Sequence, residues 1–515
     1  MAGSGRSRVK SIEQSIADTD EPDSKLRKEL GALDLVVFGV AVAVGAGIFT
    51  LTARAAGDVA GPSVSLAFVL AAIACGLAAL CYAEFASTVP VAGSAYTFSY
   101  ATFGELVAWV VGWDLVLEFA LAAGVVAKGW SAYLAQFLGL IGVPLKSASF
   151  PLAGPISFDW GALLIIAALT WVIATGVKLS SRVSQVITAI KIAVVLLVLV
   201  VGIAYVKVAN YTPYIPPPAA ASGGGSGGSV LTQSVVSLIG GSSTSTFGVY
   251  GLLAAASLVF FAFIGFDVVA TTAEETRNPA KDLPRGIIGS LLVVTVLYVA
   301  VSLVLTGMVN YRQLATQPDG THATLATAFA LNGVNWAAVV ISLGALAGLT
   351  TVVLVLMLGQ TRVLFAMCRD GLMPKRLART GSRGTPTRIT LVVGLVVAIG
   401  ATFFPASSLE EMVNIGTLFA FVLVSVGVVV LRRTRPELPR AFRTPLVPLI
   451  PILAVLACLW LMLNLSVETW LRFVIWMAIG FVVYYAYGRG HSRFANESGA
   501  PAVAARGGTP GRDAR

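Results

Sequence analysis

Long apolar runs recur along the whole chain, and they constrain its fold more than any other feature. Twelve of them approach or exceed the roughly 20 residues that a helix needs to cross a lipid bilayer. Only 12% of the residues are charged, whereas soluble proteins carry about 25%. We therefore expect an all-α integral membrane protein with twelve transmembrane helices. The expected ranges are 34–56, 62–88, 105–137, 160–177, 183–206, 248–272, 285–309, 327–361, 388–404, 409–431, 447–466 and 468–487.

The distribution of basic residues indicates how these helices are oriented. With the N-terminus in the cytoplasm, 28 of the 35 Lys and Arg residues fall in cytoplasmic segments and five fall in external loops. Such an excess is typical of the cytoplasmic side of membrane proteins. We expect both termini to be cytoplasmic, and the net charge of +10 then gives no reason to expect nucleic acid as a partner.

Tails and a long loop divide the chain into two sets of five helices and one further pair. Because five is odd, the two sets enter the membrane with opposite topology, as in transporters built from inverted repeats. The expected segments are a cytoplasmic N-terminal tail (1–33), a first repeat (34–206), an external loop rich in Pro, Gly and Ser (207–247), a second repeat (248–431), two more helices (447–487) and a C-terminal tail (488–515).

Glycines interrupt the first apolar run where a spanning helix should be most regular. Gly45 and Gly47 each weaken a helix by about 1 kcal/mol relative to alanine. A break at this depth is tolerated where protein or a water-filled cavity surrounds it, but small residues also allow close helix packing. The sixth run has a matching interruption, with Gly265 and Asp267 near its end. Two interruptions at corresponding positions of inverted halves favour a ligand site over a packing notch.

A site made from two broken helices suits a zwitterion. Amides freed at a half-helix N-terminus carry partial positive charge and suit a carboxylate. Carbonyls freed in the sixth helix suit an ammonium group. An α-amino acid presents both groups side by side, so we expect an L-amino acid as the ligand.

Lys191 lies nine residues after Arg182 in the fifth run, or about 13 Å along a helix that rises 1.5 Å per residue. Its amine is too deep to reach the membrane surface easily. One interpretation is a structural lysine that pairs with backbone carbonyls. The other is a proton carrier beside the first break, because burial in the membrane disfavours the charged form.

The third run carries three more ionisable residues. Glu118 is an amino-group ligand, a second proton site or a structural hydrogen-bonding group. Asp114, one turn earlier, is expected to be solvated near the cytoplasmic end, and Lys128 to extend toward the external side. At the end of the second run we expect Glu84 to be solvated or paired, and in the sixth we expect Asp267 to cap the break or pair.

Other chemistry is not indicated by the sequence. His322 and His491 have no nearby metal or triad partner, no phosphate-binding Walker motif is present, and Cys75, Cys81 and Cys458 lie in apolar runs. We expect no enzyme activity, metal, cofactor, disulfide or ATP dependence. Short helices along the inner membrane surface are expected over 92–104 and 362–376, the second containing Cys368 in a basic loop.

Several short segments of the chain resemble the amino acid–polyamine–organocation transporters, and within them the bacterial branch of the cationic amino acid transporter family. The similarity covers about 30–487. The segments that carry it are Gly45-Ala46-Gly47-Ile48-Phe49, Gly112-Trp113, Leu117-Glu118-Phe119, Gly129-Trp130-Ser131-Ala132-Tyr133, Phe260-Phe261-Ala262-Phe263-Ile264-Gly265-Phe266-Asp267, Thr271-Thr272-Ala273-Glu274-Glu275, Asn278-Pro279, Asp282-Leu283-Pro284 and Arg369-Asp370-Gly371.

The resemblance implies a LeuT-like fold of five plus five inverted helices, with two extra at the end, in the bacterial inner membrane. It implies that the substrate carboxylate meets backbone amides of the first break and that the ammonium meets carbonyls of the sixth helix. Lys191 stands where proton-coupled members replace a sodium site. The implied substrate-binding residues are Gly45, Ala46, Gly47, Ile48, Glu118, Phe261, Ala262 and Ile264, and the implied proton-coupling residues are Lys191 and Glu118.

The sequence departs from the family pattern at three places: near Ala41, where a glycine often stands; at Ala46, where a hydroxyl is common; and at Lys128, which replaces an apolar residue. The leading hypothesis is a proton-coupled importer of L-amino acids, with Ala46 and the apolar stretch around Phe261 favouring small or neutral side chains. An exchanger or facilitator that prefers cationic amino acids or polyamines is the alternative, and a non-transporting sensor is a remote one.

Overall fold

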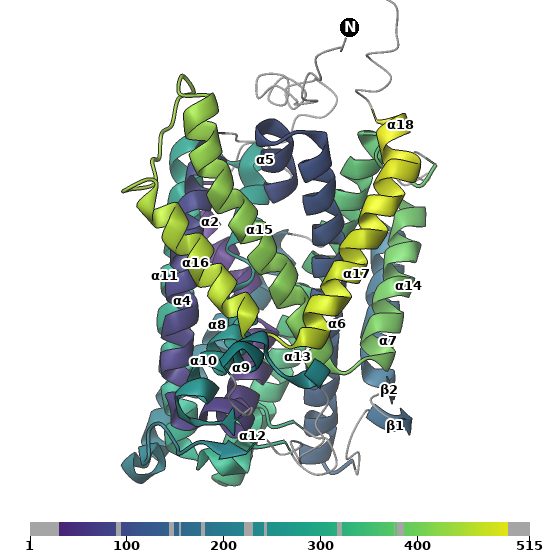
Figure 1. Ribbon diagram of the computed structural model, residues 1–515. Helices are drawn as coiled ribbons and strands as arrows, with labels where there is room; N and C mark the ends of the chain where they lie inside the picture. The colour runs from purple at the N-terminus through teal and green to yellow at the C-terminus, as the bar shows by residue number, and fades with distance from the viewer. Residues whose placement is uncertain are drawn as a thin grey trace, which may run out of the picture.

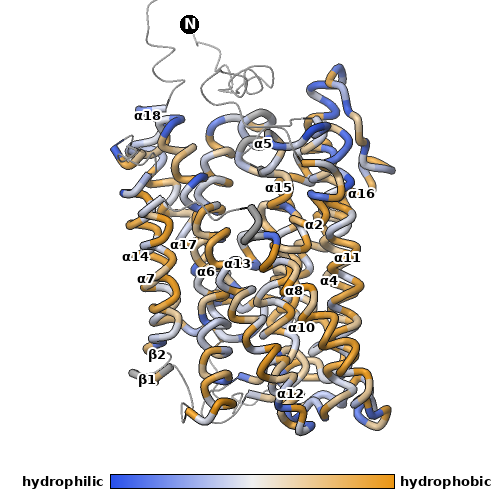
Figure 2. Tube along the Cα trace, turned by 180° about the vertical axis from the view of Figure 1, so that it is seen from behind, coloured by the Kyte–Doolittle hydropathy of each residue, from blue (hydrophilic) through white to orange (hydrophobic). Residues whose placement is uncertain are grey.

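The computed structural model describes residues 30–88, 94–143, 149–153, 156–176, 181–220, 230–240, 245–316, 322–374, 376–378 and 386–492. Within these ranges the protein is a bundle of long helices that lie side by side (Figure 1). Hydrophobic residues run along the helices, and hydrophilic residues gather at the two ends (Figure 2). Most of the predicted tails and the glycine-rich part of the predicted loop, 221–229, lie outside the described residues.

The first half of the chain contains the helices that surround the first break. They are α2 (Ala32–Ala43), α3 (Thr52–Arg54), α4 (Val64–Thr88), α5 (Ser94–Thr102), α6 (Glu105–Leu140), α7 (Trp160–Ala174) and α8 (Ser181–Gly202). Two short strands, β1 (Ser149–Ala153) and β2 (Ile156–Asp159), pair antiparallel just before α7.

The second half contains more helices and a second small strand pair. The helices are α9 (Val235–Gly240), α10 (Gly248–Val259), α11 (Pro279–Met308), α12 (Leu325–Leu331), α13 (Asn335–Arg369), α14 (Thr387–Phe403), α15 (Ala406–Thr434), α16 (Leu449–Leu463), α17 (Val467–Val483) and α18 (Arg489–His491). Strands β3 (Ala219–Ala220) and β4 (Ser245–Thr246) pair antiparallel.

Eight helical runs in the described part of the chain are long and apolar enough to cross a membrane. Four shorter apolar helices, α2, α7, α14 and α16, lie among them. An all-helical membrane protein is therefore confirmed. The count of twelve spanning helices stays a prediction, as do the inverted repeat and the expected domain boundaries.

Two predicted boundaries in the second half were wrong. The run 327–361 is not one helix, because the chain breaks between α12 and α13 at Gly333, whose φ of +76° favours glycine. The expected surface helix over 362–376 does not form, since residues up to Arg369 continue α13. We expected the chain to leave the membrane at Arg362, but a helix can extend beyond its apolar run. Cys368 therefore lies buried inside α13 rather than in a loop.

Helix α6 is the central element of the bundle, packing against α13, α15, α14 and α7. Near one end it is tied to α17 by a stack of tryptophans. The rings of Trp113 and Trp476 are 4.6 Å apart, and the indole of Trp113 donates to the carbonyl of Trp476 at 2.9 Å. The short helix α5 lies at the same end of the bundle as α18 (Figure 1), and it falls within 92–104, where a short surface helix was expected.

Candidate functional site

The first break separates α2 from the rest of the first apolar run. Helix α2 ends at Ala43, and Val44 leaves the helical region with a ψ of 88°. The chain becomes helical again in a π-helical turn over Gly47–Leu51. Gly47 is required there, because a Cβ would lie 2.3 Å from the Cα of Ala262. The predicted residues 45–48 are all buried.

The second break follows α10. A 3₁₀ turn covers Phe260–Phe263, and the chain is then extended at Ile264, with a ψ of 126°. Gly265 has a φ of +134°, which favours glycine. The backbone N–H of Gly265 donates to Oδ1 of Asp267 at 3.1 Å, so the expectation that Asp267 caps this break is confirmed.

The two breaks lie against each other. Gly47 contacts Ala262, and a Cβ on Gly265 would lie 3.0 Å from the backbone nitrogen of Ala43. The structure thus brings the predicted residues of the first break next to those of the second. Whether they bind substrate stays a prediction.

Tyr298 of α11 connects the two breaks, and the sequence analysis missed it. Its hydroxyl lies 2.6 Å from the carbonyl oxygen of Ala43 and 2.9 Å from that of Ala262. The ring is fully buried, packed between Phe68 and Phe263 at centroid distances of 5.5 and 5.4 Å. One hydroxyl proton is therefore shared between the last carbonyl of α2 and a carbonyl of the second break. Tyr298 could have been suspected from the sequence, because it is a single tyrosine in the apolar stretch of α11.

Lys191 of α8 lies beside the end of α2. Its Nζ donates to the carbonyl oxygen of Ala41 at 2.9 Å, and its stem packs on Gly348 of α13. The side chain is buried. A contact with a backbone carbonyl is what we expected of a structural lysine. The contact is made beside the first break, where we expected a proton carrier. A role in carrying protons stays a prediction.

Glu118 lies on α6 and faces α15. It is buried, hydrogen-bonds to Thr417, and interacts electrostatically with Asp114 and Asp267. Asp114 was expected to be solvated, and this was wrong, since its side chain is 0% exposed. Helix α15 covers it, because Gly416 leaves room for a carboxyl group between the two helices.

Lys128 extends toward the start of α7, where its side chain is paired and mostly buried; that this is the external side stays a prediction. Its Nζ lies 3.7 Å from Oδ2 of Asp159. The other oxygen of Asp159 accepts hydrogen bonds from the Ser131 hydroxyl at 2.6 Å and from the backbone N–H of Ala162 at 3.0 Å. Asp159 caps α7, so the lysine neutralises a buried cap. The sequence analysis missed Asp159, which lies 31 residues from Lys128 along the chain.

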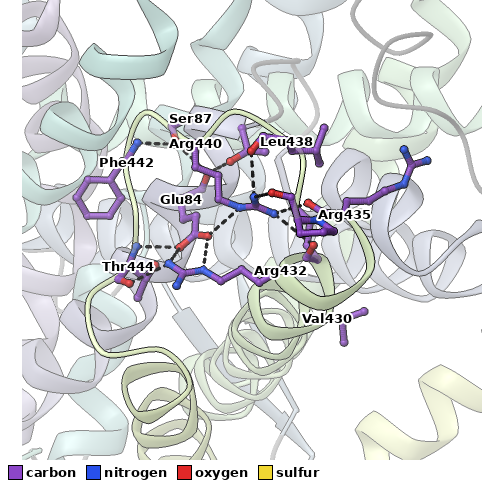
Figure 3. Close-up of polar contacts among 12 residues, drawn as sticks. Glu84, Ser87, Val430, Arg432, Arg435, Leu438, Arg440, Phe442 and Thr444 are labelled. Atoms are coloured by element: carbon purple, nitrogen blue, oxygen red, sulfur yellow. Dashed lines mark hydrogen bonds and ion pairs between the residues drawn. The ribbon is translucent and has the colours of Figure 1, made fainter.

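Two ion pairs join helices far apart in sequence. Arg54, in the helix that follows the first break, makes a two-point contact with Glu410 in the first turns of α15. The second pair involves Glu84 at the end of α4, which accepts hydrogen bonds from Nε and Nη2 of Arg432 at 2.8 and 2.7 Å (Figure 3). The expectation that Glu84 is solvated or paired is confirmed as pairing.

The loop between α15 and α16 completes the cluster around Glu84. The backbone N–H of Thr444 donates to the Glu84 carboxylate at 2.8 Å, and Nε of Arg440 lies 3.4 Å from it. Arg440 also donates to the carbonyls of Leu438 and Arg435, at 3.0 and 2.8 Å. The loop is thereby folded onto the end of α4 (Figure 3).

No metal-binding geometry was found among the described residues, where no group of three or more His, Cys, Asp or Glu side chains is placed to hold an ion. The four cysteines, all within described helices, are free and buried.

The proteins to which this chain is similar are consistent with its bundle of long apolar helices. A family model described as amino acid permease matches residues 30–485. The chain is 46% identical to the branched-chain amino acid permease BcaP of Bacillus subtilis (strain 168) over 492 residues, covering 94% of this chain and 98% of that protein. It is 43% identical to the methylthioribose transporter of the same organism, covering 91% and 95%. It is 33% identical to cationic amino acid transporter 4 of Homo sapiens, covering 84% of this chain and 63% of that protein.

These relatives are named as transporters, and the helices of this chain suit a membrane. The protein is therefore a multi-pass membrane transporter for amino acid uptake rather than an enzyme, and the expected resemblance is confirmed. Because the family match spans nearly the whole chain and these relatives are highly similar to it, the chain belongs to the amino acid permease family.

Proposed function

We propose that this protein imports neutral L-amino acids with branched aliphatic side chains in symport with protons, by alternating access across the bacterial inner membrane. Both termini then lie in the cytoplasm. The observation that carries the proposal is the direct contact between two broken helices, joined by the Tyr298 hydroxyl. We assign the fold to the LeuT-like class, with five plus five inverted helices in a total of twelve.

The backbone at the breaks provides both halves of a zwitterion site. The amides of Gly45, Ala46 and Gly47 stand at the N-terminus of the resumed helix, where partial positive charge favours a carboxylate. The carbonyls of Phe261, Ala262 and Ile264 face the ammonium group. Ile48 borders the site, and Glu118 lies deeper on α6.

Proton coupling is proposed through the end of α2. The last carbonyls of a helix have no partner within it, and a cation there is stabilised by the helix dipole. Lys191 supplies a donor to Ala41. A protonated Lys191 holds the last turn of α2 in place and stabilises the outward-open, substrate-binding state. Loss of the proton toward the cytoplasm weakens that contact and favours release.

The choice of a neutral side chain follows from the lining of the breaks. Ala46 has no hydroxyl, and the residues from Phe261 to Ile264 are apolar, so a charged side chain would find no partner among them. Two relatives are named as branched-chain amino acid permeases. Buried Glu118 favours a cationic substrate, and an exchanger with that preference is the second candidate.

The test is uptake of radiolabelled leucine into liposomes that contain the purified protein, with and without an inward proton gradient. Isoleucine, valine, arginine and lysine serve as competitors. We expect uptake to rise with the gradient and to be blocked by isoleucine and valine. Lys191→Met, a neutral side chain of similar length, should lose the response to the gradient. Undiminished gradient dependence in Lys191→Met would refute the proton role, and strong counterflow with no effect of the gradient would favour the exchanger.

A further inference from the structure

Asp114 is a buried acid for which the mechanism above has no role. It lies on α6 with 0% of its side chain exposed. It faces α15 at Gly416, where an added Cβ would lie 2.7 Å from Oδ1 of Asp114. Only a residue without a side chain leaves space for the carboxyl group at this contact. The packing of the two helices is therefore adapted to an acid that has no access to water.

Both carboxyl oxygens of Asp114 are buried, and neither has a hydrogen-bond partner within the described ranges. Four other buried acids in the same structure do have partners. Glu84 and Glu410 pair with arginines, and Asp159 and Asp267 accept hydrogen bonds from backbone amides. The protein supplies donors to those four carboxylates and none to Asp114.

The charged groups around this part of α6 are acidic. Glu118, one turn along the helix, interacts electrostatically with both Asp114 and Asp267. Among the described residues, no Lys, Arg or His forms an ion pair with Asp114 or Glu118. The other side chains that face this part of α6 from the packed elements are neutral: Thr417 of α15, Gln360 of α13, Trp476 of α17 and Tyr82 of α4.

An ionised Asp114 would be strongly unfavourable in these surroundings. Removing a carboxylate from water is costly even after the protein relaxes, and here no donor offsets that cost. Two acids one turn apart in a region of low dielectric also disfavour each other's ionisation. A neutral carboxylic acid avoids both penalties, because it carries no charge.

We propose that Asp114, one turn from Glu118, is a further proton-binding site of the transport cycle, distinct from Lys191. In the conformation described here, Asp114 holds the proton as a carboxylic acid. When α6 and α15 separate and water enters, the acid releases H⁺ to water and becomes a carboxylate. This inference rests on the proton coupling proposed above, and it assigns the site to one ligand, the proton.

The first test is the number of protons moved per leucine, obtained from reversal potentials in liposomes. Asp114→Asn has the shape of the neutral acid but cannot release a proton. We expect it to bind leucine and to lose one proton per leucine from the stoichiometry, with a flatter pH profile. Asp114→Glu keeps a titratable acid and should restore the wild-type stoichiometry.

Several outcomes would overturn the proposal, and they can be told apart. A wild type that moves no protons would refute the coupling and this site together. Wild-type coupling that is unchanged in Asp114→Asn would refute only this site, and would make Asp114 a permanently neutral structural acid. Selective loss of competition by arginine in Asp114→Asn would show that the carboxylate binds a cationic side chain instead.

A second measurement keeps the proposal testable should Asp114→Asn fail to fold. Infrared difference spectra of the wild type at two pH values report the carbonyl stretch of a protonated carboxylic acid. We expect a pH-dependent band that shifts in frequency in Asp114→Glu. A wild type without such a band, or a band unaffected by the substitution, would contradict proton binding at Asp114.

Discussion

Removing the hydroxyl of Tyr298 should weaken substrate binding as well as lower the stability of the fold. Tyr298→Phe keeps the ring between Phe68 and Phe263 and deletes only the donor shared by the carbonyls of Ala43 and Ala262. Losing a hydrogen bond in a buried region, and leaving an acceptor without a donor, costs about 1–2 kcal/mol. If the breaks hold the substrate, that loss corresponds to about a 5- to 30-fold rise in Kd.

The assay is equilibrium binding of labelled leucine to purified protein, together with thermal unfolding with and without leucine. Tyr211→Phe is a matched control, because Tyr211 also donates to a carbonyl of α11, that of Leu303, at 2.7 Å. Both variants should lower the Tm of the ligand-free protein by similar amounts. Only Tyr298→Phe should lose affinity and part of the stabilisation by leucine.

Two results would refute this reasoning. If Tyr298→Phe bound leucine with wild-type affinity, the shared hydrogen bond would not shape the site. If both tyrosine variants lost affinity equally, the effect would come from general loosening of α11 rather than from the breaks.

Two further predictions concern packing and the cluster around Glu84. Gly47→Ala places a Cβ 2.3 Å from both the Cα and the Cβ of Ala262 and should abolish leucine binding. Gly76→Ala, where a Cβ meets nothing within 4 Å, should bind normally; equal binding by both variants would contradict the close approach. Glu84→Gln removes the charge that pairs with Arg432 and Arg440. It should lower the free energy of unfolding by about 2–3 kcal/mol, measured as a lower Tm, without changing leucine affinity. Its control is Glu437→Gln, which alters an exposed pair with Arg435 and should leave the Tm unchanged, and a Tm equally low in both would refute the special role of the buried cluster.

The helices and the breaks were predictable because each depends on local composition. An apolar run long enough to span a bilayer has few alternatives to a helix, and Gly45, Gly47 and Gly265 weaken a helix wherever they occur. The positions of the breaks could therefore be read from the sequence alone. Helix ends were less predictable, since Arg362 ended the apolar run but did not end α13.

The partners of polar residues could not be predicted, because they depend on which helices become neighbours. Asp114 resembled a solvated residue near a helix end until α15 was seen to cover it. Lys128 is paired with Asp159 through the approach of α7 to α6. Tyr298 lies 255 residues from Ala43 along the chain. A sequence pattern gives the depth of such residues in the membrane but not the direction in which their side chains point.

The end of α2 explains how the two parts of the proposed mechanism depend on each other. Its terminal carbonyls need donors from outside the helix, and two other helices supply them. Lys191 of α8 donates to Ala41, and Tyr298 of α11 donates to Ala43 while also contacting Ala262 of the second break. The Lys191 contact depends on a proton in the proposed mechanism, and the Tyr298 contact depends on the two breaks remaining together.

The Lys191 and Tyr298 contacts therefore stabilise the same turn of α2. Losing one contact changes the free energy that the other contributes. In the proposed mechanism, proton binding at Lys191 orders the turn that positions the first break, and substrate bound between the breaks holds that turn in place for Lys191. Thermodynamic linkage requires the two effects to be equal. Leucine should accordingly bind more tightly at pH values where Lys191 is protonated, and Tyr298→Phe should reduce this pH dependence even though Tyr298 itself does not titrate in that range. A pH dependence of leucine affinity that is identical in the wild type and Tyr298→Phe would show that the two sites are not coupled through α2.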